Sequence, residues 1–380
     1  MEKISYLDNS ATTRVCEPAV RAACAVMTES YGNPSSLHSL GIEAERFLVR
    51  ARERVAEKLS ASPEEIVFTS GGTEANNLAL FGAAEAGKRK GNRIITTAAE
   101  HPSVLESVER LERDGFEAVI LPVDGRGVVS EEDLAEAIDP NTILVSVMHV
   151  NNETGSVQPV EQIRRIAARK RAPALIHVDA VQSFGKLPLR PERMGINLLS
   201  LSGHKIHAPK GVGALYIARG VRIPPRTFGG GQEKGRRSGT EALPLIAALG
   251  AAVDALPVLP EELARQRRLA EHLKTGLSEF PEAIVNSPGD ALPGIINFSI
   301  RGLGAEVLLN HLASQGVYVS SGSACAKGKS SHVLQAMGLE RNRIDSALRA
   351  SFSRFTVEED LDRLLEGIRN ALHIITRTGK

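Results

Sequence analysis

A lysine, Lys205, follows an apolar run at 198–201 and comes just after Ser202 and His204. A lysine that its surroundings keep unprotonated can form a Schiff base with a carbonyl compound. The serine and the histidine beside it can bind phosphate. Lys210 is a rival five residues on, but its Pro-Lys-Gly setting is typical of a turn. A solvated surface lysine is the alternative, and the preceding apolar run favours a reactive amine.

Asp179 ends a second apolar run, at 174–178. A carboxylate in that place can keep a pyridine nitrogen protonated, which makes the ring an electron sink. Gln182 comes about one helical turn later and can donate a hydrogen bond to a ring oxygen. The alternative interpretation is a strand-end aspartate that caps a turn.

The stretch 70–77 contains a glycine pair, Gly71 and Gly72, followed by Thr73 at the start of a predicted helix. Glycines let the backbone approach an anion, and the free N–H groups of a helix start point toward it. The pattern indicates a phosphate cradle without the spacing of a P-loop. A glycine turn with a threonine N-cap is the alternative.

Three further side chains could contact a cofactor or substrate. His101 stands before Pro102, which suits a helix start, and its imidazole could stack on an aromatic ring. Arg349 could grip a carboxylate with two parallel hydrogen bonds, and Asn33 could help from the other side. A helix-entry histidine and structural roles for the other two residues are the alternatives.

The chain has three cysteines, Cys16, Cys24 and Cys325. Cys325 lies in a small, polar, glycine-rich segment, and Lys327 and Lys329 close behind it favour a thiolate. A harmless exposed thiol is the alternative for this residue. Cys16 and Cys24 fall in or beside the apolar pattern of a predicted N-terminal helix, so we expect them to pack in the core.

Short apolar runs alternate with helical patterns through the middle of the chain. Strands are predicted at 66–69, 93–97, 116–121, 143–148, 174–178 and 198–201, and helices at 17–27, 73–86, 103–113, 131–137 and 160–170. This rhythm predicts a mainly parallel sheet covered by helices on both faces. Ligands of such sheets bind beyond the carboxyl ends of the strands, where the polar clusters 70–73, 100–101, 151–153 and 179–182 fall.

The pattern changes near 256–260, after an Ala-rich helical stretch. Helices are predicted at 261–278, 306–314 and 358–374, and strands at 295–300 and 317–320. These elements indicate a smaller α+β domain, joined by the first few residues of the chain. We therefore expect a large domain over 15–256 and a small domain, built from 1–14 and 257–380, that carries the Cys325 segment.

Composition narrows the class of protein. A net charge of +1 over 380 residues gives the protein no strong overall electrostatic field that would attract nucleic acid or a membrane surface. The N-terminus has no apolar signal-peptide segment, and no run approaches about 18 consecutive apolar residues. An odd, sparse cysteine set favours a reducing compartment over a disulfide framework. We expect a cytoplasmic protein that binds neither nucleic acid nor a membrane.

Taken together, these segments closely resemble the cysteine desulfurases of the bacterial iron–sulfur and nitrogen-fixation type, which are pyridoxal 5'-phosphate (PLP) enzymes with the class V aminotransferase fold. The likeness runs from about residue 4 to 375, with matching stretches at 6–13, 32–36, 68–77, 148–155, 177–180, 202–213, 229–240 and 320–325. It implies the aspartate aminotransferase-like fold type I, with a mainly parallel seven-stranded sheet and a smaller α+β domain. It also implies an enzyme that converts L-cysteine to L-alanine and leaves a persulfide on Cys325.

The resemblance implies a role for each matching residue. Lys205 would carry the cofactor as an internal aldimine, Asp179 would pair with the pyridinium, and His101 would stack on the ring and help proton transfer. The other cofactor contacts would be Gly72, Thr73, Ser202 and His204 at the phosphate, Gln182 at the ring oxygen and Asn152 beside the cofactor. Thr240 would reach the phosphate of a partner subunit, which implies a homodimer. Asn33 and Arg349 would bind the substrate carboxylate.

In the implied reaction, the Cys325 thiolate attacks the sulfur of bound cysteine. The sulfur then passes to an acceptor such as an iron–sulfur scaffold or a tRNA-thiolation enzyme. The resemblance implies no resident metal. It also implies that Cys325 contributes to the transient transfer of an iron–sulfur cluster. The segment after Cys325 is shorter than in the best-known housekeeping enzymes, and the chain stops near Lys380 without their longer tail, which leaves the acceptor open. His207 and Ala208 stand where an aromatic and a glycine are common, and we expect little effect on the chemistry.

Other functions fit the sequence less well. Selenocysteine lyase shares this fold and cofactor and is the nearest alternative. A simple aminotransferase has no use for a loop thiol. A non-catalytic sulfur-relay or scaffold subunit would not need the set Lys205, Asp179, His101 and Cys325. A nucleotide-binding protein would need a P-loop lysine or a dinucleotide glycine pattern, and this sequence has neither.

Overall fold

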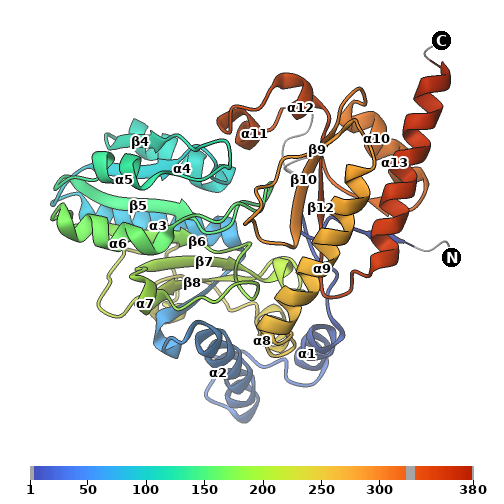
Figure 1. Ribbon diagram of the computed structural model, residues 1–380. Coiled ribbons are helices and arrows are strands. Elements are labelled where there is room, and N and C mark those ends of the chain that lie inside the picture. Colours follow the sequence, from blue (N-terminus) through green and yellow to red (C-terminus); the bar gives the residue numbers. More distant parts are fainter. Residues whose placement is uncertain (1–3, 322–329, 379–380) are drawn as a thin grey trace.

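The computed structural model describes residues 4–321 and 330–378 and is organised around a seven-stranded sheet (Figure 1). The strand order is β2-β8-β7-β6-β5-β3-β4. The strands are β2 (Ile66–Thr69), β3 (Arg93–Thr97), β4 (Glu117–Leu121), β5 (Thr142–Met148), β6 (Leu175–Asp179), β7 (Leu198–Ser202) and β8 (Gly213–Ile217). Strand β8 runs antiparallel to both of its neighbours, and the remaining pairs are parallel. The predicted mainly parallel sheet is confirmed.

Helices cover both faces of this sheet, as the sequence predicts. They are α1 (Glu17–Thr28), α2 (Ser39–Leu59), α3 (Gly72–Gly87), α4 (Pro102–Arg113), α5 (Glu131–Ala137), α6 (Val160–Arg169), α7 (Pro191–Met194) and α8 (Leu243–Asp254). Helices α3 and α4 pack on one face, and α1, α2, α5, α6 and α8 build the core on the other. Because both faces are buried, strands such as β5 are almost continuously apolar.

A second unit stands beside the large sheet. Its sheets are β12 (Ala347–Ser351), β10 (Ile295–Ile300) and β9 (Ala283–Val285), all antiparallel, and the parallel pair β1 (Ser5–Tyr6) and β11 (Val317–Tyr318). Its helices are α9 (Leu259–Ser278), α10 (Ala305–Ser314), α11 (His332–Ala336), α12 (Arg341–Asp345) and α13 (Glu358–Thr378). Both chain ends lie at this unit (Figure 1). It has its own hydrophobic core, which supports the boundaries at 14/15 and 256/257 that we propose for the two domains.

The structure corrects several details of the sequence prediction. Cys16 is buried as expected, but Cys24 is exposed, so the prediction that it packs in the core is wrong. Strand β11 ends at residue 318 rather than 320, and α13 continues past residue 374. Helix α2 and strands β8 and β12 were not predicted at all.

Among the helices that the structure describes, none is by itself long and apolar enough to cross a membrane. The bent pair α8 and α9 has the length and composition of a broken span when the two are taken together. Helix α8, however, contributes most of its side chains to the core beside the large sheet.

Candidate functional site

A cavity of about 240 Å³ opens where the carboxyl ends of the parallel strands face the N-terminal segment and β12. Ten of the residues singled out from the sequence line it: Gly72, Thr73, His101, Asn152, Asp179, Gln182, Ser202, His204, Lys205 and Arg349. Six others line it as well: Ser10, Ala11, Asn76, Ser103, Met148 and Val181. Strand ends that are distant in sequence thus converge on one hollow, as the rule for parallel sheets predicts.

Lys205 ends a short 3-10 turn, Gly203–Lys205, directly after β7. Its Nζ donates to the backbone oxygens of Ser10 at 2.5 Å and Ala11 at 2.8 Å. Sequence reasoning missed both acceptors because each acts through its carbonyl group, which any residue type would supply. The amine is therefore held against the first residues of the chain.

The environment of Lys205 favours the free amine. Burial lowers its pKa to about 7, and the charges of Arg349 and Lys186 act in the same direction. The carboxylates of Asp8 and Asp179 oppose the shift, and they are the smaller contributions. At neutral pH a large fraction of the side chain is therefore an unprotonated nucleophile.

Asp179 ends β6 and is almost completely buried. One carboxylate oxygen accepts from Asn76 Nδ2 at 2.8 Å, and the other accepts from the Val181 N–H at 2.9 Å. These two bonds fix the carboxylate at the floor of the cavity. Asn76 was not singled out from the sequence, although a polar residue on the buried face of the apolar helix α3 was a usable signal.

His101 caps the N-terminus of α4. Its Nδ1 accepts from the Ser103 N–H at 3.1 Å, which leaves the ring proton of the neutral form on Nε2. Burial is the main cause that lowers the pKa of His101, and the charges of Lys205 and His332 add to it, while Asp179 opposes it. The lowered pKa favours a neutral imidazole that can both stack and exchange protons.

Glu100 directly precedes His101 in the chain and is fully buried. Both carboxyl oxygens lie within 3.0 Å of the Met148 N–H, and one also accepts from Thr97 Oγ1 at 2.8 Å. Burial raises its pKa to about 8 against these hydrogen bonds. Glu100 is thus a protonated group at neutral pH that ties the carboxyl ends of β3 and β5 together.

The opposite end of the cavity suits an anion. Helix α3 begins at Gly72 with no side chain capping its first N–H groups, and a Cβ on Gly72 would lie 2.7 Å from the Val181 side chain. Ser202 is buried there, and His204 Nδ1 lies 3.2 Å from Thr12 Oγ1. Burial lowers the pKa of His204 to about 4, so the ring is neutral and can donate one hydrogen bond.

Arg349 is the largest fully buried side chain of the described residues. Its Nη2 donates to Asp8 Oδ1 at 2.6 Å and its Nη1 to the Asn152 backbone oxygen at 2.9 Å. Its Nε has no hydrogen-bond partner among residues 4–321 and 330–378. The guanidinium is therefore held in place with unused capacity to bind an anion in the cavity.

Not every predicted site residue reaches this cavity. Asn33 is exposed and its Oδ1 accepts from the Ser35 N–H at 2.9 Å. Thr240 is exposed and lines no part of the cavity. Cys325 lies outside the described residues.

The chain on either side of the undescribed segment 322–329 is fixed close to the cavity. Ser320 exchanges backbone hydrogen bonds with Arg349 at 3.1 and 2.6 Å. Ser331 Oγ donates to the buried Glu153 at 2.5 Å. His332 Nε2 lies 2.9 Å from the Glu100 backbone oxygen. The chain therefore enters and leaves this segment beside residues that line or support the cavity.

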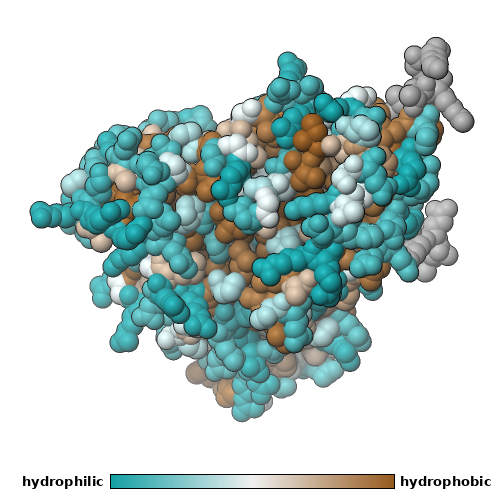
Figure 2. Space-filling view, viewed as in Figure 1, coloured by the Kyte–Doolittle hydropathy of each residue, from teal (hydrophilic) through white to brown (hydrophobic). Residues whose placement is uncertain are grey.

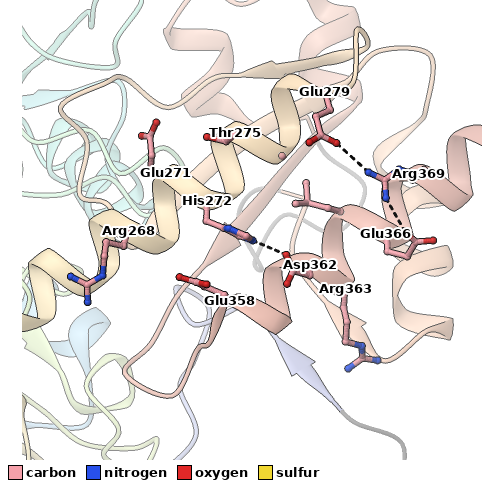
Figure 3. Close-up of a pocket in the computed structure, with 12 residues that line it drawn as sticks. Arg268, Glu271, His272, Thr275, Glu279, Glu358, Asp362, Arg363, Glu366 and Arg369 are labelled. Atoms are coloured by element: carbon pink, nitrogen blue, oxygen red, sulfur yellow. Dashed lines mark hydrogen bonds and ion pairs between the residues drawn. The ribbon is translucent and has the colours of Figure 1, made fainter.

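Figure 3 shows a second cavity, of about 820 Å³, between α9 and α13. Some of its charged side chains pair with one another: His272 lies 2.6 Å from Asp362, and Arg369 lies 3.3 Å from Glu279. None of the residues singled out from the sequence lines it. Its size alone does not indicate a site of reaction.

The smaller cavity fits a phosphorylated pyridine aldehyde such as PLP. It offers an amine for the aldehyde, a carboxylate for the ring nitrogen and a helix start with Ser202 and His204 for the phosphate. Three buried polar atoms at its wall have no hydrogen-bond partner in the part of the chain that the structure describes: Ser10 Oγ, Asn76 Oδ1 and Arg349 Nε. Buried polar groups in proteins are nearly always hydrogen-bonded, so these atoms indicate a polar ligand.

Comparison with known proteins agrees with this geometry. The aminotransferase class-V family matches residues 5–364. The chain is 44% identical over 367 residues to Cysteine desulfurase 2 of Trichormus variabilis, which covers 96% of this chain and 92% of that protein. It is 43% identical to Cysteine desulfurase IscS of Clostridium botulinum, covering 96% of this chain and 94% of that protein. A solved structure described as a NifS-like protein superimposes with a TM-score of 0.93 at 40% identity, covering 98% of this chain and 100% of that chain. The chain therefore belongs to the class-V aminotransferase family, among the relatives named cysteine desulfurase.

Proposed function

We propose that this protein is a PLP-dependent cysteine desulfurase that converts L-cysteine to L-alanine and carries the sulfur as a persulfide. The observation that carries the proposal is the Lys205 amine, whose pKa is lowered to about 7 in a cavity that also holds Asp179 and His101. The identity to proteins named cysteine desulfurase supports the choice of substrate.

PLP, when bound, supplies an electron sink for the bonds at the α-carbon of an amino acid. Lys205 would hold the cofactor covalently and afterwards accept and return protons at its Nζ. Asp179, which Asn76 fixes, would keep the ring nitrogen protonated. His101, with its proton on Nε2, would stack on the ring and move protons. Gly72, Thr73, Ser202 and His204 would hold the phosphate, with Gln182 and Asn152 beside the ring.

Arg349 is proposed to bind the substrate carboxylate. It is charged, buried and already oriented by Asp8 and the Asn152 carbonyl, so little entropy is lost when a carboxylate arrives. Asn33 does not line the cavity, and its proposed role as a second carboxylate contact requires the 32–36 turn to move or the substrate to extend past Arg349.

Cys325 is proposed as the sulfur acceptor. Its thiolate would form a bond to the substrate sulfur, the bond between that sulfur and the substrate Cβ would break, and the electron pair would pass to the carbon side. Protonation of that carbon side gives alanine, and Cys325 keeps the transferred sulfur as a persulfide. The attachment of residues 320 and 331 beside the cavity supports this assignment.

A homodimer is proposed as the active unit, with Thr240 reaching the partner's phosphate site. Large apolar side chains are exposed on α1 and α2, at Val20, Met27, Leu40, Ile42 and Val49. Figure 2 shows hydrophobic residues at the lower end of the face in view, where Figure 1 places α2. Exposed apolar surface of this kind is typical of protein interfaces. We also propose a cytoplasmic location and a protein acceptor for the sulfur, such as an iron–sulfur scaffold or a tRNA-thiolation enzyme.

The purified protein tests this proposal directly. It should be yellow, and borohydride should bleach it and fix the cofactor mass on the peptide containing Lys205. With L-cysteine it should give alanine and a persulfide on Cys325. Cys325→Ala should abolish sulfur release, whereas Cys24→Ser, at an exposed thiol, should not change it. A colourless protein indifferent to added PLP would refute the assignment, and faster turnover of selenocysteine would favour a selenocysteine lyase.

A further inference from the structure

A second lysine, Lys186, lies behind the cavity without lining it. It follows Gln182 by four positions in a tight turn after β6, where Phe184 and Lys186 are held by backbone bonds to Ala180 and Ser183. Lys186 is half-buried, and its Nζ lies 3.3 Å from Gln182 Oε1. No role in the proposed reaction uses this amine.

Hydrogen bonds connect Lys186 to Lys205 through two residues. Lys186 donates to Gln182 Oε1, Gln182 Nε2 donates to the Ser10 backbone oxygen at 2.9 Å, and Lys205 Nζ donates to the same oxygen at 2.5 Å. An ammonium group has no acceptor capacity, so the carbonyl end of the Gln182 amide must face Lys186. The NH₂ end then faces Ser10 and the cavity.

The charges around this chain of bonds are unevenly compensated. The Arg349 guanidinium has the Asp8 carboxylate at 2.6 Å. For Lys186, no carboxylate among residues 4–321 and 330–378 lies within ion-pair distance, and its one hydrogen bond there goes to a neutral amide. A half-buried cation without a carboxylate partner raises the free energy of any further positive charge close to it.

The groups that face the two amines come from several elements. Arg349 on β12, Asp8 after β1 and Asp179 on β6 act on Lys205 together with Lys186. His204 and His207 also feel the Lys186 charge, and burial lowers the pKa of each to about 4, so both rings are neutral. Burial, with Arg349 adding to it, lowers the pKa of Lys186 itself to about 8.

We propose that Lys186 is a positioning residue of the site: it fixes the orientation of the Gln182 amide, and its charge keeps Lys205 in the free-amine form. This inference rests on the proposed function of Lys205 as the residue that holds the cofactor. A lysine that merely fills space would leave the protonation of Lys205 unchanged when it is replaced by a neutral side chain of similar length.

The test compares four full-length variants with the wild type. Lys186→Gln and Lys186→Met remove the charge, Lys186→Arg retains it, and Lys210→Gln removes an exposed charge five residues after Lys205. After the cofactor is removed, the protein is labelled with a trace of acetic anhydride at a series of pH values. Mass spectrometry of the Lys205 peptide then gives the midpoint for reaction of its amine.

We expect the Lys205 midpoint to rise by about one pH unit in Lys186→Gln and Lys186→Met, which lowers its labelling at pH 7 by about fivefold. Lys186→Arg and Lys210→Gln should leave it within about 0.3 unit of the wild type. Equal midpoints in all five proteins, or a shift in Lys186→Arg as large as in Lys186→Met, would overturn the inference. In the wild type, Lys186 should label with a midpoint near 8, and a midpoint clearly below that of Lys205 would also overturn the inference, because Lys186 would then be uncharged where Lys205 titrates.

Absorbance of the bound cofactor distinguishes a failure of this inference from a failure of the proposed function. In the reconstituted protein, the pH midpoint of the bound-cofactor absorbance should rise in Lys186→Gln and Lys186→Met and return toward the wild-type value in Lys186→Arg. Absence of any cofactor absorbance in the wild type would sink the proposed function, while the labelling of Lys205 would still report on Lys186. Normal absorbance with unmoved midpoints would sink only the role of Lys186.

Discussion

The cavity at the edge of the large sheet and the larger cavity between α9 and α13 both contain charged side chains, but they differ in how far these side chains are exposed to water. Between α9 and α13, His272 and Asp362 pair across the mouth of the larger cavity with 36% and 59% of their side chains exposed. At the edge of the large sheet, Arg349 is 1% exposed and Asp179 is 5% exposed. Exposed pairs are screened by solvent and contribute little to stability. Buried charges interact strongly and shift one another's protonation.

This difference separates a surface feature from a site of chemistry. In the larger cavity, His272 pairs with Asp362, and Arg369 pairs with both Glu279 and Glu366, all at exposed positions. In the smaller cavity the pKa values of Lys205, His101 and His204 are all lowered by burial. Three polar atoms at its wall have no hydrogen-bond partner among the described residues. Perturbed protonation in a polar hollow, rather than volume, identifies the functional site.

Of the predicted changes, replacement of Lys205 in the smaller cavity should have the largest effect. Lys205→Ala removes the amine that holds the cofactor, and alanine formation from L-cysteine should fall by roughly a thousandfold or more. Lys210→Ala, at an exposed position, should retain wild-type turnover. Turnover and borohydride fixation measured on both variants check this prediction. A Lys205→Ala protein with near-normal turnover would refute it.

Truncation of a buried cation should cost far more than truncation of an exposed one. Arg349→Met leaves Asp8 and the Asn152 carbonyl without their partner, and we expect a loss of about 2–3 kcal/mol in the free energy of unfolding. Arg369→Met, at the rim of the larger cavity, should cost no more than about 0.5 kcal/mol. Urea unfolding of both variants measures the difference, and equal losses would contradict it.

The buried Glu100 carboxyl should make the stability of the protein depend on pH, as an exposed carboxyl would not. Between about 4.5 and about 8, folded Glu100 holds a proton that the unfolded chain has released, so wild-type stability contains a term that falls as pH rises. Glu100→Gln keeps the neutral shape and has no proton to lose. Its stability relative to wild type should therefore grow by about 1–3 kcal/mol from pH 5 to pH 8 and level off above that.

Urea midpoints at several pH values check the behaviour of Glu100. The matched control is Glu112→Gln on the exposed side of α4, for which the difference from wild type should be flat with pH. A flat difference for Glu100→Gln as well would mean that this carboxyl is ionised in the folded protein.

The smallest effect is expected in the larger cavity. His272→Gln removes one side of the exposed pair with Asp362, and we expect less than about 1 kcal/mol of destabilisation and unchanged turnover. A thermal melt and a desulfurase assay are sufficient measurements. A tenfold loss of turnover would show that the larger cavity takes part in the reaction.

Most of the fold could be predicted from local patterns in the sequence. Strands β3, β5 and β6 are buried on both faces, so their apolar runs mark them clearly. Helix α2 was missed because charged residues interrupt its apolar stripe, and β8 follows a glycine-rich turn that masks its short apolar run. Cys24 was misplaced because the apolar pattern of α1 does not distinguish its exposed face from a position one residue earlier.

The site was predictable where side chains act and hidden where the backbone acts. Residues such as Asp179 and Lys205 stand at strand ends, where parallel sheets bind ligands. The carbonyls of Ser10 and Ala11 leave no trace in the sequence, because any residue could provide them. Lys186 was not singled out from the sequence, since its proposed role depends on a chain of hydrogen bonds that only the folded protein forms.

The pairing of the first strand with late parts of the chain sets the order in which the site can be completed during synthesis. Strand β1 pairs with β11, Asn9 bonds to the Ser351 backbone, and the carbonyls that hold Lys205 follow Asn9 directly, at Ser10 and Ala11. During synthesis, residues 5–9 are made more than 300 residues before these partners. We therefore expect the N-terminal wall beside Lys205 to reach its folded position only when almost all of the chain has been translated.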